Sequence, residues 1–158
     1  MIRYLTLSIS ITFLSWILGI FIGAFLVRTE FYRKNLTNLN FITSKSINKL
    51  IGIGAIKWVV KNTFFKFFNP NLKMKRKTDI GEADKLRKEM TSAEINHLIG
   101  FVAVVIFIIV VIFKGKYLLA MVMMIVNILM NLYPSLLQQE NKRRIDKLRN
   151  LLTRSCSR

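Results

Sequence analysis

The sequence is poor in the side chains on which many enzyme classes depend. Its 158 residues include one cysteine, one histidine and only eight acidic residues. The lone Cys156 has no partner for an intramolecular disulfide, so a free reduced thiol is expected. No glycine-rich phosphate-binding loop is present. A cysteine nucleophile is not favoured, because Cys156 lies in a polar tail and is the third residue from the end.

The scarcity of histidine also argues against a metal centre. Glu94 and His97 have the Glu-x-x-His spacing that builds di-iron sites, but those sites need the motif on two helices. His97 is the only histidine, so a metal site would need a second subunit or poorly ligating amides. We therefore expect no metal and no resident cofactor.

Long apolar segments are what the chain does have. Hydrophobic residues make up 53% of the sequence and the mean hydropathy is +0.40, values typical of membrane proteins. Residues 4–27 carry no charge. A run of about 24 residues can cross a hydrocarbon core of about 30 Å. Because this run is longer than a signal-peptide core and lacks a small-x-small cleavage site, it is predicted to be an uncleaved anchor.

Two further apolar segments predict a helical hairpin, residues 95–113 and 117–137, with a tight turn at Lys114-Gly115-Lys116. Residues 138–158 form a basic amphipathic tail. The predicted fold class is therefore an all-α integral membrane protein, a single membrane domain over residues 1–158 with three transmembrane helices and a basic C-terminal helix.

The segment 28–94 is predicted to be an interfacial loop. Between residues 45 and 61, lysines follow one helical face and apolar residues the other, which is typical of a helix lying in the membrane surface. A helix packed on the bundle is the alternative. The aromatic cluster at residues 64–68 indicates an interface anchor or an acyl-chain groove. Residues 82–90 are predicted to form a short polar helix.

Basic residues orient this arrangement. Residues 28–94 contain fifteen lysines and arginines and the tail contains seven, against one before the first helix and two in the hairpin turn. Three crossings place the loop and the tail on the same side, and the positive-inside rule makes that side cytoplasmic, with the N-terminus outside. Lipid head groups thus account for the net charge of +17, and no nucleic-acid recognition motif accompanies it.

Nearly all of the polarity within the membrane segments falls on the hairpin. On a straight helix Asn127, Asn131, Pro134, Gln138 and Asn141 lie within about 80° of one another. In an antiparallel hairpin centred near Gly115, Glu94 lies level with Gln138 and His97 level with Pro134. If the stripe faces the second helix, an acid, an imidazole and several amides converge at the cytoplasmic edge of the bilayer. Ionisable groups at membrane depth are functional hypotheses by default.

Two interpretations of these residues remain open. Glu94 and His97 project from one helix face, so the carboxylate could orient an imidazole that removes a proton from a hydroxyl. Alternatively, Thr91-x-x-Glu94 matches a capping box at a helix start. The asparagines could bind a substrate, or they could hold helices together through hydrogen bonds.

The same residues carry a resemblance to the glycosyl-diaponeurosporenoate acyltransferase family of staphyloxanthin-type carotenoid biosynthesis. The matching pattern is Ala93-Glu94-Ile95-Asn96-His97, a Lys-Gly turn at Lys114-Gly115, and Asn131-Leu132-Tyr133-Pro134 followed by Gln138, Asn141 and Arg144. It covers roughly residues 80–152. The chain departs from the pattern at Gln139 and Glu140, where the family has arginine and tyrosine, and its proline falls one place later.

The resemblance implies transfer of a fatty acyl group onto a sugar hydroxyl of a glycosylated carotenoid or similar glycolipid at the inner leaflet. In this interpretation His97 is the base, Glu94 orients it, and Asn127, Asn131, Gln138 and Asn141 bind sugar or the oxyanion. Arg144 and nearby basic residues would hold an anion such as the phosphates of a coenzyme A thioester, the acyl donor considered, or a lipid head group. The first helix or a second copy would complete the pocket. The rival hypothesis is a non-enzymatic membrane subunit or lipid-binding scaffold.

Overall fold

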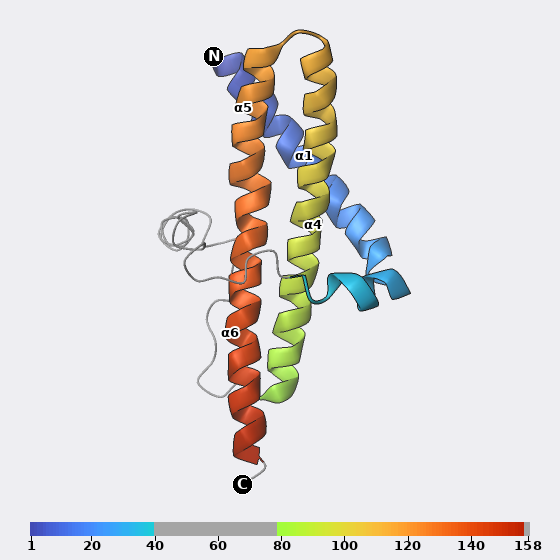
Figure 1. The fold of residues 1–158 in the computed structure, drawn as a ribbon, viewed down its shortest axis with the longest axis vertical. Helices are drawn as coiled ribbons and strands as arrows, with labels where there is room; N and C mark the ends of the chain where they lie inside the picture. The colour runs from blue at the N-terminus through green and yellow to red at the C-terminus, as the bar shows by residue number, and fades with distance from the viewer. Residues whose placement is uncertain (40–78, 157–158) are drawn as a thin grey trace. The chain divides into compact units, whose positions relative to one another are not determined.

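The computed structural model describes residues 1–39 and 79–156, and within these ranges every regular element is helical, which confirms the all-α prediction. In chain order the elements are α1 (Ile2–Leu26), the π-helical η1 (Tyr32–Leu36), α4 (Ile80–Phe113), α5 (Tyr117–Asn127), the π-helical η4 (Ile128–Leu132) and α6 (Tyr133–Cys156) (Figure 1). The surface helix predicted between residues 45 and 61 and the aromatic cluster at 64–68 lie outside the described residues.

Three helices are long and apolar enough to cross a membrane. They are Ile2–Leu26, Ile80–Phe113 and Tyr117–Arg154, which contain the predicted segments 95–113 and 117–137 and nearly all of 4–27. Large apolar side chains on all three are exposed, among them Phe21, Phe107 and Leu118. Apolar surface on this scale suits contact with acyl chains, as the sequence predicts.

The second helix begins earlier than predicted. It starts after Asp79, whose carboxylate caps it by accepting the Glu82 amide at 2.6 Å. No glycine or proline interrupts residues 82–99, so the expected polar helix and the apolar helix are one. Thr91 lies within this helix and its hydroxyl donates to the Arg87 carbonyl at 2.9 Å. Because an N-cap must lie at a helix start, the capping-box interpretation of Thr91 and Glu94 is wrong.

The third membrane-spanning helix, formed by α5, η4 and α6, changes register in its middle. Pro134 has no N–H, and in a regular α-helix its ring would clash with the Met130 carbonyl. The chain widens into the π-helical η4 just before it, and the helical path then continues to Cys156 rather than ending near residue 137. The extra residue in this turn rotates the later side chains. The buried face consequently runs through Ser135 and Gln139, while Gln138 is half-buried.

The hairpin turn is confirmed. Gly115 has a φ of +70°, a conformation that glycine adopts without strain. The Lys116 amide donates to the Val111 carbonyl at 3.2 Å and the Gly115 amide donates to Ile112 at 2.8 Å. This pair of hydrogen bonds is the Schellman motif, which satisfies the last carbonyls of α4 and reverses the chain.

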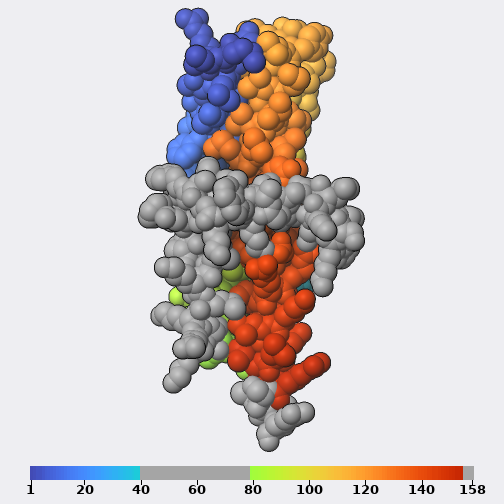
Figure 2. Space-filling view, turned by 90° about the vertical axis from the view of Figure 1, so that its left-hand side faces the viewer, coloured from blue at the N-terminus to red at the C-terminus, as the bar shows by residue number. Residues whose placement is uncertain are grey.

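The chain divides into two compact units. The first comprises Met1–Thr37 and Ser92–Ser135. In it α1 packs beside α5, as Figures 1 and 2 both show. Its apolar core joins α4 to α5 through Val104, Ile108, Val111, Leu119, Ala120 and Met123. The second comprises Asn38–Thr91 and Leu136–Arg158. Its small core contains Ala83 and Met90 of α4 with Ile145 of α6.

Candidate functional site

One face of α1 is made of small residues. Ser8, Thr12, Ser15, Gly19 and Gly23 are all buried, and their spacing of three or four places them on one side of the helix. The Thr12 hydroxyl donates to the Ser8 carbonyl at 2.8 Å, and the Ser15 hydroxyl donates to Thr12 at 2.7 Å. Their polar groups are thus satisfied within the helix. Such small residues, including Gly19-x-x-x-Gly23, let another helix come close.

The helix that comes close is α4, at Asn96. A Cβ atom at Gly19 would overlap the Asn96 backbone carbonyl, and one at Gly23 would overlap the Asn96 side chain. With its side-chain nitrogen oriented toward them, Asn96 donates to the Gly19 carbonyl at 3.2 Å and to the Ser92 carbonyl at 3.3 Å. The contact fixes α1 against α4 one residue away from His97.

His97 lies between an aromatic ring and an amide. The Trp16 ring of α1 is nearly parallel to the imidazole, with a centroid distance of 6.4 Å and an interplanar angle of 13°. From η4, the side-chain amide of Asn131 interacts with the imidazole. Nδ1 of His97 is buried and has no hydrogen-bond partner among the described residues. An acceptor or donor in the site would satisfy this nitrogen.

A hydrogen-bonded pair of amides connects three helices. Nδ2 of Asn131 donates to Oδ1 of Asn127 at 2.8 Å and to the Ser15 hydroxyl at 3.4 Å. Asn127 in turn donates to the Phe101 carbonyl at 3.1 Å. Both ends of Asn127 are therefore used within the protein, which supports its packing interpretation. Oδ1 of Asn131 lies against Gly100, where a Cβ would sit 3.1 Å away, and has no partner within residues 1–39 and 79–156.

Glu94 is fully buried one turn before His97 on the same face of α4. Tyr32 of η1 is 6% exposed. Burial raises the pKa of the Tyr32 hydroxyl, and the negative charge of Glu94 raises it further. This hydroxyl therefore keeps its proton at neutral pH. In the described ranges, no three His, Cys, Asp or Glu residues gather as a metal site.

The first unit thus brings together four of the seven predicted site residues: Glu94, His97, Asn127 and Asn131. It also adds Ser15, Trp16, Tyr32 and Gly100, which the sequence prediction missed. The regular spacing of small residues along α1 is a signal that could have found Ser15 and, next to it, Trp16. No comparable pattern marks Tyr32, because it lies in a mixed basic segment.

The other three predicted residues belong to the second unit. Gln138 is half-buried, and Asn141 is buried with neither amide atom hydrogen-bonded within the described part of the chain. Arg144 is exposed, and its Nη2 lies 3.2 Å from Oε1 of Glu140. The acid that departs from the family pattern therefore forms an ion pair with the predicted anion-binding arginine.

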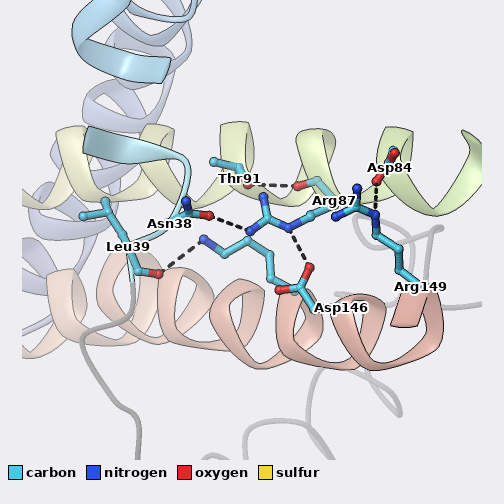
Figure 3. A network of polar contacts seen from close by, with 8 residues as sticks. Asn38, Leu39, Asp84, Arg87, Thr91, Asp146 and Arg149 are labelled. Atoms are coloured by element: carbon cyan, nitrogen blue, oxygen red, sulfur yellow. Dashed lines mark hydrogen bonds and ion pairs between the residues drawn. The ribbon is translucent and has the colours of Figure 1, made fainter. Parts of the chain in front are cut away.

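Charged contacts join the first turns of α4 to α6 in the second unit (Figure 3). Nε of Arg87 lies 2.7 Å from Oδ1 of Asp146, and Nη2 donates to Asn38 at 2.8 Å. Farther along, Nε of Arg149 lies 3.0 Å from Asp84. These pairs are partly exposed, so each contributes at most about 1 kcal/mol to stability.

The fold and the site define an all-α protein with three helices able to span a membrane, a buried acid, buried amides and a half-buried imidazole. Residues 28–151 match the family model described as glycosyl-4,4'-diaponeurosporenoate acyltransferase, and the chain belongs to this family. Membership supports an acyltransferase role in carotenoid biosynthesis, which implies a lipid-like acceptor and an acyl donor. No curated protein and no solved structure matches the chain.

Proposed function

We propose that this protein is a multi-pass membrane acyltransferase. It transfers a fatty acyl group to a hydroxyl of a glycosylated carotenoid, or of a similar glycolipid, at the inner leaflet. Family membership supports the reaction class and the carotenoid context. The three apolar helices support a membrane location, and the acceptor and its leaflet are part of the proposal.

In the proposed reaction His97 acts as general base. It takes the proton of the acceptor hydroxyl as that oxygen attacks the acyl carbonyl, while Glu94 stabilises the imidazolium. With a thioester donor, the new ester C–O bond replaces the C–S bond, and His97 returns the proton to the departing thiolate. Oδ1 of Asn131 receives a hydrogen bond from a sugar hydroxyl. Transfer is direct, with no acyl-enzyme intermediate.

The remaining predicted residues have separate roles. Asn127 orients Asn131 through their 2.8 Å hydrogen bond. Gln138, Asn141 and Arg144 stay candidates for binding other polar parts of the substrates. No resident cofactor is required, because an acyl thioester would enter as a substrate.

The observation that carries the proposal is the environment of His97. A lone imidazole stacks on Trp16, approaches Asn131 and keeps its buried Nδ1 without a partner among the described residues. Buried polar atoms are normally hydrogen-bonded, and an exception in an apolar helix bundle calls for an explanation. A substrate hydroxyl at this nitrogen would supply it.

Replacing His97 tests the proposal. Wild type and His97→Ala are expressed at matched membrane levels in cells that make the glycosylated carotenoid acid, and pigments and polar lipids are profiled by mass spectrometry. We expect acylated product to fall by about 10²–10⁴-fold, the usual contribution of a general base. Val102→Ala, a change at an exposed position of the same helix, should leave product unchanged. Equal product in His97→Ala and wild type would rule out a catalytic His97.

A non-enzymatic membrane subunit or lipid-binding scaffold is the second candidate. The hydrogen bonds that link Ser15, Asn131, Asn127 and Phe101 favour it, because they hold three helices together without any substrate. The same lipid profiles discriminate the two functions. If no acylated species depends on the wild-type protein, the scaffold is supported.

We also propose that the N-terminus lies outside and the C-terminus in the cytoplasm, from the bias of basic residues. Cys156 is the only cysteine and therefore a specific label near the C-terminus. A membrane-impermeant maleimide should modify it in inside-out vesicles and leave it unmodified in intact cells. Cys156→Ser is the control for background labelling. Modification in intact cells would show that the C-terminus lies outside and would contradict the proposed orientation.

A further inference from the structure

The second unit contains a small basic cleft. Its volume is about 240 Å³. It is lined by Asn38, Leu39, Arg87, Gln139, Lys142, Arg143 and Asp146. Three of these side chains are cationic and one is anionic, so the lining has an excess of positive charge. Apart from Leu39, every lining side chain is polar or charged, which distinguishes this cleft from the apolar pockets that bind most small molecules.

The polar groups of this cleft are held in place. Asp146 and Asn38 bind two different nitrogens of Arg87, at 2.7 Å and 2.8 Å, and so fix the plane of its guanidinium (Figure 3). Lys142 is only 4% exposed, and its Nζ donates to the Leu39 carbonyl at 3.5 Å. Lysine is rarely buried to this extent. A buried ammonium beside a fixed guanidinium is a preorganised arrangement for an anion.

Arg144 provides a contrast on the same helix. Its side chain is 58% exposed and forms an ion pair with Glu140 one turn earlier. Water screens the charge of an arginine that is more than half exposed, so Arg144 gains little from binding an anion. The cleft residues, not Arg144, therefore have the burial and the geometry that the predicted anion site requires.

We propose that this cleft binds a phosphate group of one of the lipid-like ligands. The proposal rests on the proposed acyltransferase function, because that reaction requires a donor. At about 240 Å³ the cleft is smaller than the pockets of about 300–1,000 Å³ that enclose whole drug-sized ligands. It would therefore hold a head group while the remainder of the ligand lies outside. Coenzyme A thioesters and anionic phospholipids both present such a phosphate.

Direct binding measurements separate the two sources. The full-length protein is placed in phosphatidylcholine nanodiscs, and its affinity for coenzyme A is measured by equilibrium dialysis. In parallel, retention of phosphatidylglycerol from mixed micelles is measured by native mass spectrometry. The variants are Lys142→Gln and Arg143→Gln in the cleft. The matched control is Lys147→Gln, which makes the same charge change at an exposed position of α6. Circular dichroism verifies that each variant is folded. If Lys142→Gln does not fold, Arg143→Gln still tests the cleft, because Arg143 is only half-buried.

A charge-assisted hydrogen bond lost from the cleft should weaken binding by about tenfold or more. If coenzyme A binding falls in the cleft variants and persists in Lys147→Gln, the phosphate belongs to the acyl donor. If phosphatidylglycerol retention falls instead, it belongs to a lipid head group. Equal effects of all three variants on both ligands would overturn the site and leave only attraction to net charge. Selective binding by a wild-type protein that forms no acylated product would refute the proposed function and retain the cleft.

Discussion

The two compact units differ in the kind of polar contact they use. In the first, hydrogen bonds join neutral groups, such as Asn131 to Asn127 and Asn127 to the Phe101 carbonyl. In the second, contacts join full charges that are partly exposed, such as Arg87 with Asp146. Among apolar helices, a polar group without a hydrogen bond costs several kcal/mol, whereas ion pairs at the surface are screened by water. The difference supports the proposed membrane location, with the first unit among acyl chains.

Glu94 is the exception that sharpens this comparison. It is an acid, fully buried in the unit whose buried hydrogen bonds join neutral groups and whose Lys34–Glu30 ion pair is exposed. A buried carboxylate is expensive to keep within an apolar helix bundle, and the structure removes the capping role that would explain it. Its place one turn from His97 and beside Tyr32 supports a functional role in the proposed reaction.

Glycine substitutions should give the largest contrast between the units. Gly19→Ala places a methyl group against the Asn96 carbonyl, which is backbone and cannot swing away. We expect it to lower the free energy of unfolding by about 1–3 kcal/mol, the usual cost of overpacking. Gly81→Ala meets only Asp79, at an ordinary 3.5 Å, so its effect should be neutral or stabilising by up to about 1 kcal/mol.

Thermal unfolding in detergent, followed by circular dichroism, measures both glycine variants. In a Trp58→Phe background Trp16 is the sole tryptophan, so its fluorescence reports separately on the first unit, where it lies on α1 and stacks on His97. If Gly19→Ala were as stable as Gly81→Ala, the close approach of α1 to α4 would be wrong. The stacking of Trp16 on His97 would then lose its structural basis.

Replacing Asn131 should have the next largest effect. Asn131→Ala removes its hydrogen bonds to Asn127 and Ser15 and leaves Oδ1 of Asn127 unmatched. We expect a loss of about 0.6–2 kcal/mol of stability, insensitive to salt, together with reduced acyl transfer. Asn127→Ala should cost similar stability with a smaller loss of transfer in the folded fraction, because both of its ends bind protein groups.

A double-mutant cycle of Asn127 and Asn131 in detergent measures how strongly the two amides are coupled. Acyl transfer per folded protein is then compared between the single variants. Equal transfer by Asn131→Ala and wild type would leave Asn131 a packing residue only. Coupling near zero would contradict the 2.8 Å hydrogen bond between them.

The sequence predicts the helices well and their ends poorly. Apolar runs and Gly115 specify the hairpin, because chain length, hydropathy and a left-handed turn are local properties. Local pattern could not show that Thr91 is internal, since a capping box and a continuous helix share the same residues. The local pattern also missed η4, because a straight-helix projection assumes the same angle of rotation at every residue. It therefore placed Gln138 on the buried face, where the structure has Gln139.

The site was predicted in part for a related reason. Spacing on one helix pairs Glu94 with His97, and it pairs Asn127 with Asn131. The contribution of α1 depends on packing across more than eighty residues, and the family match, which begins at residue 28, does not include it. Trp16 and Ser15 enter the site only because the small residues of α1 allow close contact with α4.

Ion pairs of the second unit should show the smallest effects. Asp146→Asn removes the negative charge from the pair with Arg87, and Asp84→Asn does the same for Arg149. Because these pairs are partly exposed, each change should cost only about 0.2–1 kcal/mol, and the loss should shrink as salt is raised from about 0.05 to 0.5 M. Chemical unfolding at both salt concentrations measures this, with Asn131→Ala as the salt-insensitive reference. A large, salt-independent loss for Asp146→Asn would mean that its pair is desolvated. The two units would then no longer differ in the way their polar contacts respond to water.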